Sequence, residues 1–260
     1  MGKRVILVTN NSGRSRVSYV QKCESLGIKG VSENDVVTTS AVLGDYLKNV
    51  VNYNIAKRVY VVGSQGIENE LKNAGITSIG VGPDRMDAYQ DNVNILVKTP
   101  FAACSDEIGA VVVGYDPHIS FPKVLKAATY LKNADCLFVA TNDDETFPTS
   151  NPDIVCPGTG SIVAMVTTAA ERTPVILGKP YEPMLKYIIK HYGLLAEETV
   201  MVGDRLRTDI QFGRGYGMRT LLVLTGQSSL AEVEREKQSS TRANYVPDFY
   251  TERLGDLAAI

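Results

Sequence analysis

Short runs of β-branched and apolar residues alternate with polar turns and helical stretches along most of this 260-residue chain. Parallel strands need long crossover connections, which helices usually supply, so this alternation predicts an α/β fold with a parallel sheet covered by helices. We expect strands at residues 5–8, 36–38, 59–62, 95–97, 110–113, 136–140, 175–176, 200–202 and 220–223. We expect helices at residues 15–26, 40–50, 66–74, 121–133, 161–171, 183–192 and 209–216, with Gly75 and Gly193 as left-handed helix exits.

The amino-acid composition argues against several kinds of binding partner and cellular location. The 27 basic and 29 acidic side chains leave a net charge of −2, so charge gives no reason to expect nucleic acid or an anionic membrane as a partner. Neither a membrane-spanning run nor a secretory signal is visible, which makes the cytoplasm the expected location. The four cysteines form no Cys-x-x-Cys pair and are read as buried thiols.

The first candidate site follows the strand expected at 5–8. Thr9, Asn10 and Asn11 offer a hydroxyl and two amides, and a helix is expected to begin just beyond them. Such neutral donors, together with the positive end of the helix, suit a phosphoryl group. The alternative is an ordinary helix cap formed by Asn11 or Ser12.

The second candidate is Lys179, which follows the strand expected at 175–176 and precedes Pro180. Proline disfavours a helical conformation at the lysine, so the ammonium would lie at the strand end. There it would either neutralise phosphate oxygens or simply be solvated.

The third candidate is a pair of carboxylates after the strand expected at 200–202. Asp204 ends this strand and Asp209 begins the next helix. Mg²⁺ takes oxygen ligands and commonly uses only one or two carboxylates, with water and phosphate completing its octahedron. The alternative is that Asp209 caps the helix while Asp204 pairs with an arginine.

Four short motifs follow one another along the chain in an order that is typical of one enzyme family: Val-Thr-Asn-Asn-Ser at 8–12, Pro-Gly-Thr-Gly at 157–160, Gly-Lys-Pro at 178–180 and Gly-Asp-Arg-Leu at 203–206. Together they resemble the phosphatases of the haloacid dehalogenase superfamily, in the group of 4-nitrophenylphosphatases, phosphoglycolate phosphatases and pyridoxal phosphate phosphatases. The resemblance implies a Rossmann-like parallel-sheet core, at residues 1–51 and 174–260, interrupted by a large α/β cap at 52–173. It also implies that Thr9, Asn10, Asn11 and Lys179 bind phosphate, that Asp204 binds Mg²⁺, and that Asp209 supports the metal's surroundings.

The resemblance also assigns substrate choice to the cap. The loop at 141–148 resembles one that reaches over the active site of relatives, which makes Asn142 and Phe147 candidate substrate contacts; a polar turn is the alternative. Asp116 and His118 could orient this loop, although a turn carboxylate and a surface imidazole are the simpler interpretation. Gly158 and Gly160 are read as providing backbone freedom before a helix. Relatives of this kind often dimerise through the cap, which makes a homodimer the oligomer to expect.

One family feature has no counterpart in the sequence. The reaction of these phosphatases uses an Asp-x-Asp-Gly motif, whose first aspartate is the nucleophile, but no two aspartates here are separated by one residue. In relatives the motif lies on a strand–helix unit before the Thr-Asn-Asn motif, and we expect this first unit to be missing. Its strand would lie between the strands ending at Asn10 and at Asp204, where a gap would leave costly unpaired backbone groups.

The sequence therefore predicts a Mg²⁺-dependent phosphatase by family resemblance, whose relatives act on small phosphorylated metabolites. Turnover by the 260-residue chain is expected to be negligible because the nucleophile is absent. The alternative is a non-catalytic protein that binds a phospholigand or another protein through the retained anion-binding residues. Phosphomutase or dehalogenase chemistry is disfavoured, because those reactions need the same absent aspartate. The physiological substrate cannot be read from any motif.

Overall fold

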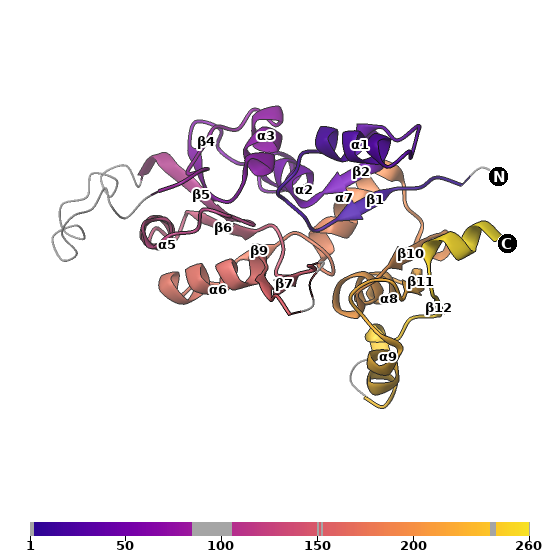
Figure 1. The fold of residues 1–260 in the computed structure, drawn as a ribbon. Helices are drawn as coiled ribbons and strands as arrows, with labels where there is room; N and C mark the ends of the chain where they lie inside the picture. Colours follow the sequence, from indigo (N-terminus) through magenta and orange to yellow (C-terminus); the bar gives the residue numbers. More distant parts are fainter. Residues whose placement is uncertain (1–2, 85–105, 150, 152, 240–242, 260) are drawn as a thin grey trace. The chain divides into compact units, whose positions relative to one another are not determined.

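The computed structural model describes residues 3–84, 106–149, 151, 153–239 and 243–259 (Figure 1). Its strands are β1 Leu7–Thr9, β2 Val36–Thr38, β3 Arg58–Val62, β4 Ser78–Ile79, β5 Ile108–Val113, β6 Leu137–Ala140, β7 Thr146–Phe147, β8 Cys156–Pro157, β9 Val175–Ile176, β10 Val200–Gly203, β11 Arg219–Val223 and β12 Phe249–Thr251. Its α-helices are α1 Arg16–Ser25, α2 Thr39–Asp45, α3 Gln65–Asn73, α5 Phe121–Leu131, α6 Thr159–Ala170, α7 Glu182–Tyr192, α8 Gln211–Gly215 and α9 Leu230–Lys237. The wider π-helical turns Tyr46–Val50 and Leu206–Ile210 follow α2 and precede α8.

The predicted α/β class is confirmed. Every strand pair except β7 with β8 is parallel, and the expected strands and helices are present wherever the structure describes them. Gly75, two residues after the end of α3, and Gly193, directly after α7, both adopt positive φ, at 79° and 62°, as their predicted role as helix exits requires. The strand expected at 95–97 lies outside the described residues. The strands β4, β7, β8 and β12 were not predicted.

Contacts group the chain into two compact units, residues 1–178 and residues 179–260. The first contains the five-stranded parallel sheet β4-β3-β5-β6-β9, the parallel pair β1-β2 and the antiparallel pair β7-β8. The second contains the parallel sheet β10-β11-β12. The division into a core at 1–51 and 174–260 and a cap at 52–173 stays a prediction.

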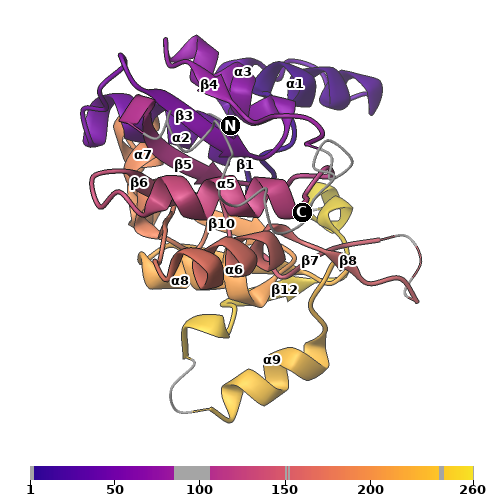
Figure 2. The same cartoon turned by 90° about the vertical axis from the view of Figure 1, so that its left-hand side faces the viewer.

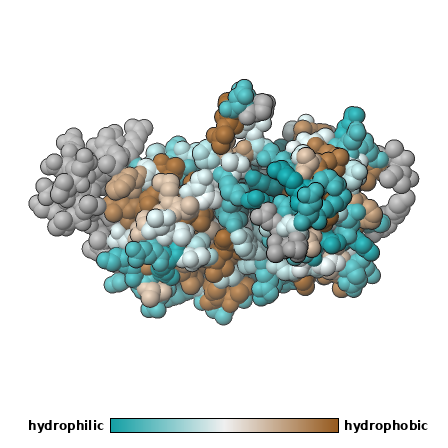
Figure 3. Space-filling view, turned by 90° about the horizontal axis from the view of Figure 1, so that it is seen from below, coloured by the Kyte–Doolittle hydropathy of each residue, from teal (hydrophilic) through white to brown (hydrophobic). Residues whose placement is uncertain are grey.

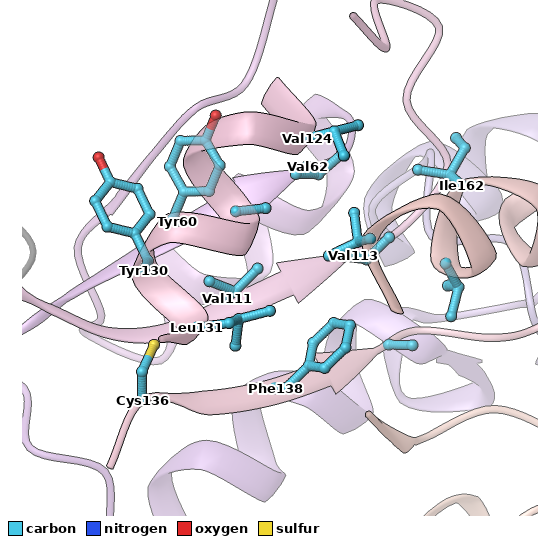
Figure 4. Packing of buried hydrophobic residues seen from close by; sticks show 14 of the residues in the cluster. Tyr60, Val62, Val111, Val113, Val124, Tyr130, Leu131, Cys136, Phe138 and Ile162 are labelled. Carbon is cyan, nitrogen blue, oxygen red and sulfur yellow. The ribbon is translucent and has the colours of Figure 1, made fainter. Parts of the chain in front are cut away.

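Helices cover both faces of the five-stranded sheet. Figures 1 and 2 show α2 and α3 on one side of β3, β5 and β6, and α5 and α6 on the other. On the α5 and α6 side, alternate strand residues such as Val62, Val111 and Val113 pack against Val124 and Ile162 (Figure 4). Burial of such apolar side chains contributes roughly 1.5–3 kcal/mol each and is the main stabilising term for this unit.

In the second unit, the apolar residues Leu206, Ile210, Leu222 and Val233 form a smaller core cluster. Asp248 joins the start of β12 to β11, since its carboxylate accepts hydrogen bonds from the backbone N–H and the hydroxyl of Thr220, at 2.8 and 2.9 Å. Arg214 also donates to this carboxylate, at 2.7 Å. A side-chain acceptor therefore fixes the neighbouring strand where the backbone ladder is only three residues long.

The surface seen in Figure 3 places hydrophobic residues in separate patches between hydrophilic ones. Among the described residues, no helix combines the length and the hydrophobicity that crossing a membrane would require.

Candidate functional site

The loop after β1 is shaped by its own side chains. The backbone N–H of Asn11 donates to Thr9 Oγ1 at 3.1 Å, and the N–H of Gly13 donates to Asn11 Oδ1 at 2.8 Å. Asn11 thus forms a local turn of the kind its short amide favours. The cap of α1 is Ser15, whose side chain accepts from the backbone N–H of Ser18, and neither Asn11 nor Ser12 has that role.

Hydroxyl groups after β2 hold the same loop in place. Thr39 Oγ1 donates to the carbonyl of Asn10 and Ser40 Oγ donates to the carbonyl of Ser12, both at 3.1 Å. Thr38 caps α2 by accepting from the N–H of Ala41. Thr38, Thr39 and Ser40 are almost fully buried, and burial of a polar side chain is tolerated when its hydrogen bonds are made. These three residues were not predicted to belong to the site, although three consecutive hydroxyl residues at the end of an apolar strand are a visible signal.

The loop at 141–148 meets the loop after β1. Asn10 and Asn142 each donate through Nδ2 to the same atom, Asp144 Oδ2, at 2.9 and 2.8 Å. Thr141 Oγ1 lies 2.9 Å from Asn142 Oδ1 and 3.2 Å from Ser12 Oγ. The structure therefore brings Asn142 and Asn10 together, 132 positions apart in the sequence, through a carboxylate that was not predicted to belong to the site.

Phe147 has a different environment within this loop. Its ring meets the ring of Tyr115 edge to face, with centroids 4.7 Å apart. Tyr115 is held in turn by Ser64, whose hydroxyl donates to the Tyr115 carbonyl at 2.6 Å. Such a pair contributes about 0.5–1.5 kcal/mol beyond its buried area and fixes the direction of Phe147.

Asp116 behaves as a turn carboxylate. It accepts the backbone N–H of His118 at 2.8 Å and pairs with the Lys123 ammonium at 2.5 Å, where both side chains are at most 1% exposed. The simpler of the two interpretations of Asp116 therefore matches its contacts.

The second unit brings the other three predicted residues together. Asp209 Oδ1 accepts from the Lys179 ammonium at 2.7 Å, and its Oδ2 accepts from the backbone N–H groups of Asp204 and Arg205, both at 3.1 Å. Lys179 and Asp209 are each only 8% exposed at the side chain. Asp209 therefore fixes both the lysine and the strand end that carries Asp204. Its role in the surroundings of a metal ion stays a prediction.

Asp204 is fixed from a second direction by the segment after β11. Its Oδ2 accepts the backbone N–H of Gln227 at 3.0 Å, and its carbonyl accepts the N–H of Ser228 at 2.9 Å. A Cβ at Gly226 would overlap with the Asp204 side chain, and a Cβ at Gly203 would overlap with Asp209. Both glycines are needed for this close approach. Gly203 belongs to the Gly-Asp-Arg-Leu motif, whereas Gly226 was not singled out from the sequence.

The two carboxylates differ in how well they suit a metal ion. Asp209 has its two oxygens engaged by an ammonium and two backbone N–H groups, so it is poorly placed to be a ligand. Asp204 offers a carboxylate with one oxygen tied by a single N–H, which suits a hard cation that takes one or two carboxylates. Across the part of the chain that the structure describes, no group of three or more His, Cys, Asp or Glu side chains gathers at one point. Asp204 thus fits Mg²⁺ as a single ligand of a site that water and phosphate would have to complete.

Comparison with known proteins identifies the family of this chain. A model of haloacid dehalogenase-like hydrolases matches residues 1–77, and a model of HAD-hydrolase-like proteins matches residues 176–257. A glycerol-3-phosphate phosphatase of Rattus norvegicus is 38% identical over 262 residues, which cover 98% of this chain and 80% of that protein. This chain belongs to the haloacid dehalogenase-like hydrolases.

Other members of this hydrolase family give the same result. Phosphoglycolate phosphatase 2 of Arabidopsis thaliana is 37% identical over 98% of this chain and 81% of its own length. The p-nitrophenyl phosphatase from Archaeoglobus fulgidus superposes with a TM-score of 0.78 at 28% identity, over 100% of this chain and 87% of that one. A glycerol phosphate phosphatase from Mycobacterium tuberculosis, in complex with magnesium, gives a TM-score of 0.75 at 26% identity, over 99% and 68%. The resemblance inferred from the motifs is confirmed, and these relatives are phosphatases by name.

Proposed function

We propose that this haloacid dehalogenase-like protein binds the phosphoryl group of a small phosphate monoester through Thr9, Asn10, Asn11 and Lys179. The observation that carries the proposal is the fixed position of Lys179, whose ammonium is held 2.7 Å from Asp209, in the turn that follows β10, with both side chains nearly buried. A cation whose place is set before a ligand arrives loses little side-chain freedom on binding, which favours an anionic ligand. The relatives named as phosphatases of glycerol 3-phosphate, phosphoglycolate and p-nitrophenyl phosphate suggest the substrate class.

Mg²⁺ is the proposed cofactor, with Asp204 as the ligand that this chain supplies. Support comes from the carboxylate chemistry of Asp204 and from the relative whose structure contains magnesium. A divalent cation in such a position neutralises phosphate oxygens. Lys179 would neutralise another part of the negative charge on the phosphate, and Asp209 would keep Lys179 and the backbone of Asp204 in place.

Turnover by the 260-residue chain is proposed to be negligible. The covalent route of the family needs an aspartate nucleophile and a second aspartate two residues later, and no pair of aspartates in this sequence has that spacing. Asn142 and Phe147 are proposed as substrate contacts on the loop at 141–148. The cytoplasmic location and a homodimer formed through the cap stay predictions from the sequence.

Activity can be tested with two forms of the protein, the chain itself and a version that carries an added upstream Asp-x-Asp-Gly strand and helix. With 4-nitrophenyl phosphate and Mg²⁺, we expect activity only from the extended version. Equal turnover by both forms would refute the account based on the missing nucleophile.

The second candidate function is non-catalytic binding of a phospholigand through Asn10, Asn11 and Lys179, for which the fixed position of the Lys179 ammonium is the supporting observation. Isothermal titration with inorganic phosphate separates the possibilities. Binding that weakens in Lys179→Ala but not in Lys186→Ala, a lysine whose side chain is 64% exposed, would show a retained anion site. If such binding occurs while even the extended version hydrolyses nothing, the non-catalytic function is favoured.

A further inference from the structure

Asp144 holds two predicted site residues at once. Its Oδ2 accepts from Asn10 at 2.9 Å and from Asn142 at 2.8 Å, and Asn10 lies 134 positions earlier in the chain. A carboxylate can only accept, so each amide must turn its NH₂ group, not its carbonyl, towards Asp144. Hydrogen bonds to a charged acceptor are also stronger than those between neutral groups. One side chain thus sets the orientation of both amides.

The backbone of this loop is fastened by the Pro-Gly-Thr-Gly segment. The N–H of Gly158 donates to the Glu145 carbonyl at 2.7 Å, and the N–H of Gly160 donates to the Asp144 carbonyl at 2.9 Å. A Cβ at Gly158 would overlap with the Asp144 carbonyl, and one at Gly160 would overlap with the Asp143 carbonyl. The φ of Gly158 is −88°, which any residue can adopt. These glycines are therefore explained by close backbone approach, and the predicted conformational freedom is not what Gly158 provides.

We propose that Asp144 is a positioning residue that fastens the loop at 141–148 to Asn10. The segment at 157–160 holds the loop backbone, and the Asp144 carboxylate then joins it to the loop after β1. The proposal rests on the proposed function for its meaning, since Asn10 is a phosphate contact only if that function holds. Under it, the loop that carries Asn142 and Phe147 is placed directly beside a phosphate-binding residue.

The connection can be measured by hydrogen exchange, with the amides of Gly158 and Gly160 as reporters because both donate to carbonyls of the loop. Asp144→Ala and Asn10→Ala are each expected to speed their exchange at least tenfold. The double variant is expected to be no faster than either single one, because both changes remove the same connection. Unchanged exchange in the single variants, or fully additive effects, would overturn the proposal. Asp153→Ala removes an exposed carboxylate from a nearby turn and is the matched control.

A second pair of variants guards against general unfolding. Gly160→Ala should loosen the loop without altering any side chain of the connection, and we expect the Gly158 amide to exchange faster in it. Gly215→Ala is the control, because a Cβ there meets nothing within 4 Å. If Gly160→Ala leaves the exchange of Gly158 unchanged, the close packing of Gly160 against the Asp143 carbonyl does not fasten the loop.

Rescue by a conservative change separates positioning from a simple charge effect. Asp144→Asn keeps an acceptor, so the exchange rates of the Gly158 and Gly160 amides should stay within about twofold of the wild type, and so should the affinity for inorganic phosphate. Asp144→Ala should weaken phosphate binding about threefold or more. Tighter phosphate binding by both variants would mean that the carboxylate competes with the anion, which overturns the positioning role. If the wild type binds no phosphate, the proposed function fails, while the exchange experiment still decides the role of Asp144.

Discussion

Replacing Asp209 by alanine is expected to destabilise residues 179–260 by about 4 kcal/mol. The change removes the carboxylate that accepts from the Lys179 ammonium and from two backbone N–H groups. Removing one partner of a buried ion pair costs about 3–5 kcal/mol, and the slight exposure of this pair, 8% for each side chain, favours the lower end. The two N–H groups that lose their acceptor add roughly 1 kcal/mol between them, because water can reach part of this site.

Urea denaturation at pH 7, followed by circular dichroism, measures this loss. Glu234→Ala is the matched control, because Glu234 and Lys237 are also 2.7 Å apart in the same unit but are 62% and 49% exposed. That exposed pair should contribute less than about 1 kcal/mol. In the double variant Asp209→Asn/Lys179→Met, the loss of unfolding free energy should be clearly smaller than the sum of the losses in Asp209→Asn and in Lys179→Met. A loss below about 1 kcal/mol in Asp209→Ala, or additivity in the double variant, would refute this account of the pair.

Three further predictions concern the folded chain. Asp116→Ala should cost about 3 kcal/mol or more of unfolding free energy, because Lys123 is 1% exposed and would keep a buried ammonium without its carboxylate; Lys123→Met in that variant should restore part of the loss in urea denaturation, and no recovery would contradict the reasoning. Burial raises the pKa of Asp248, but hydrogen bonds from Thr220 outweigh it and hold the pKa below the usual 3.8. The carboxylate therefore contributes stability that is complete well above pH 3.8 and is lost as the pH falls below that value and through the lower pKa of the folded state. The stability difference between wild type and Asp248→Asn should be constant from pH 7 to about 5 and shrink below about 4; a constant difference down to pH 3 would be inconsistent with it. Burial also raises the pKa of the Cys136 thiol to about 11, so at pH 8 only about 0.1% is thiolate and iodoacetamide should label it, by mass spectrometry, only after unfolding. Rapid labelling of Cys136 itself in the native protein would contradict its burial.

Local sequence patterns were sufficient for most of the fold. Apolar β-branched runs such as those at β2 and β5 need no distant partner to be recognised, because alternating or continuous hydrophobicity is visible within a few residues. The same holds for Gly75 and Gly193, since a glycine after a helical stretch is a local signal. The short strands β4, β7 and β8 have two residues each and lack a β-branched apolar pair such as Val175-Ile176 of the equally short β9, so they are recognised only through the strands beside them.

Within the site, sequence order identified the groups but not how they are held. Motif spacing singled out Asn10, Lys179, Asp204 and Asp209, and the structure places the last three in one hydrogen-bonded cluster. The role of Asp144 could not be read in the same way, because it depends on a contact across 134 residues.

The sequence by itself determined the fold class, the family and the residue types available for phosphate and metal chemistry. Tertiary structure alone decided which of these residues share a carboxylate, and why a Cβ is excluded at Gly158, Gly203 and Gly226. The physical reason is the distance along the chain over which the deciding interactions act. Secondary structure follows from interactions between near neighbours along the chain, whereas the orientation of an amide or the space beside a glycine depends on atoms that only the folded path of the chain brings near.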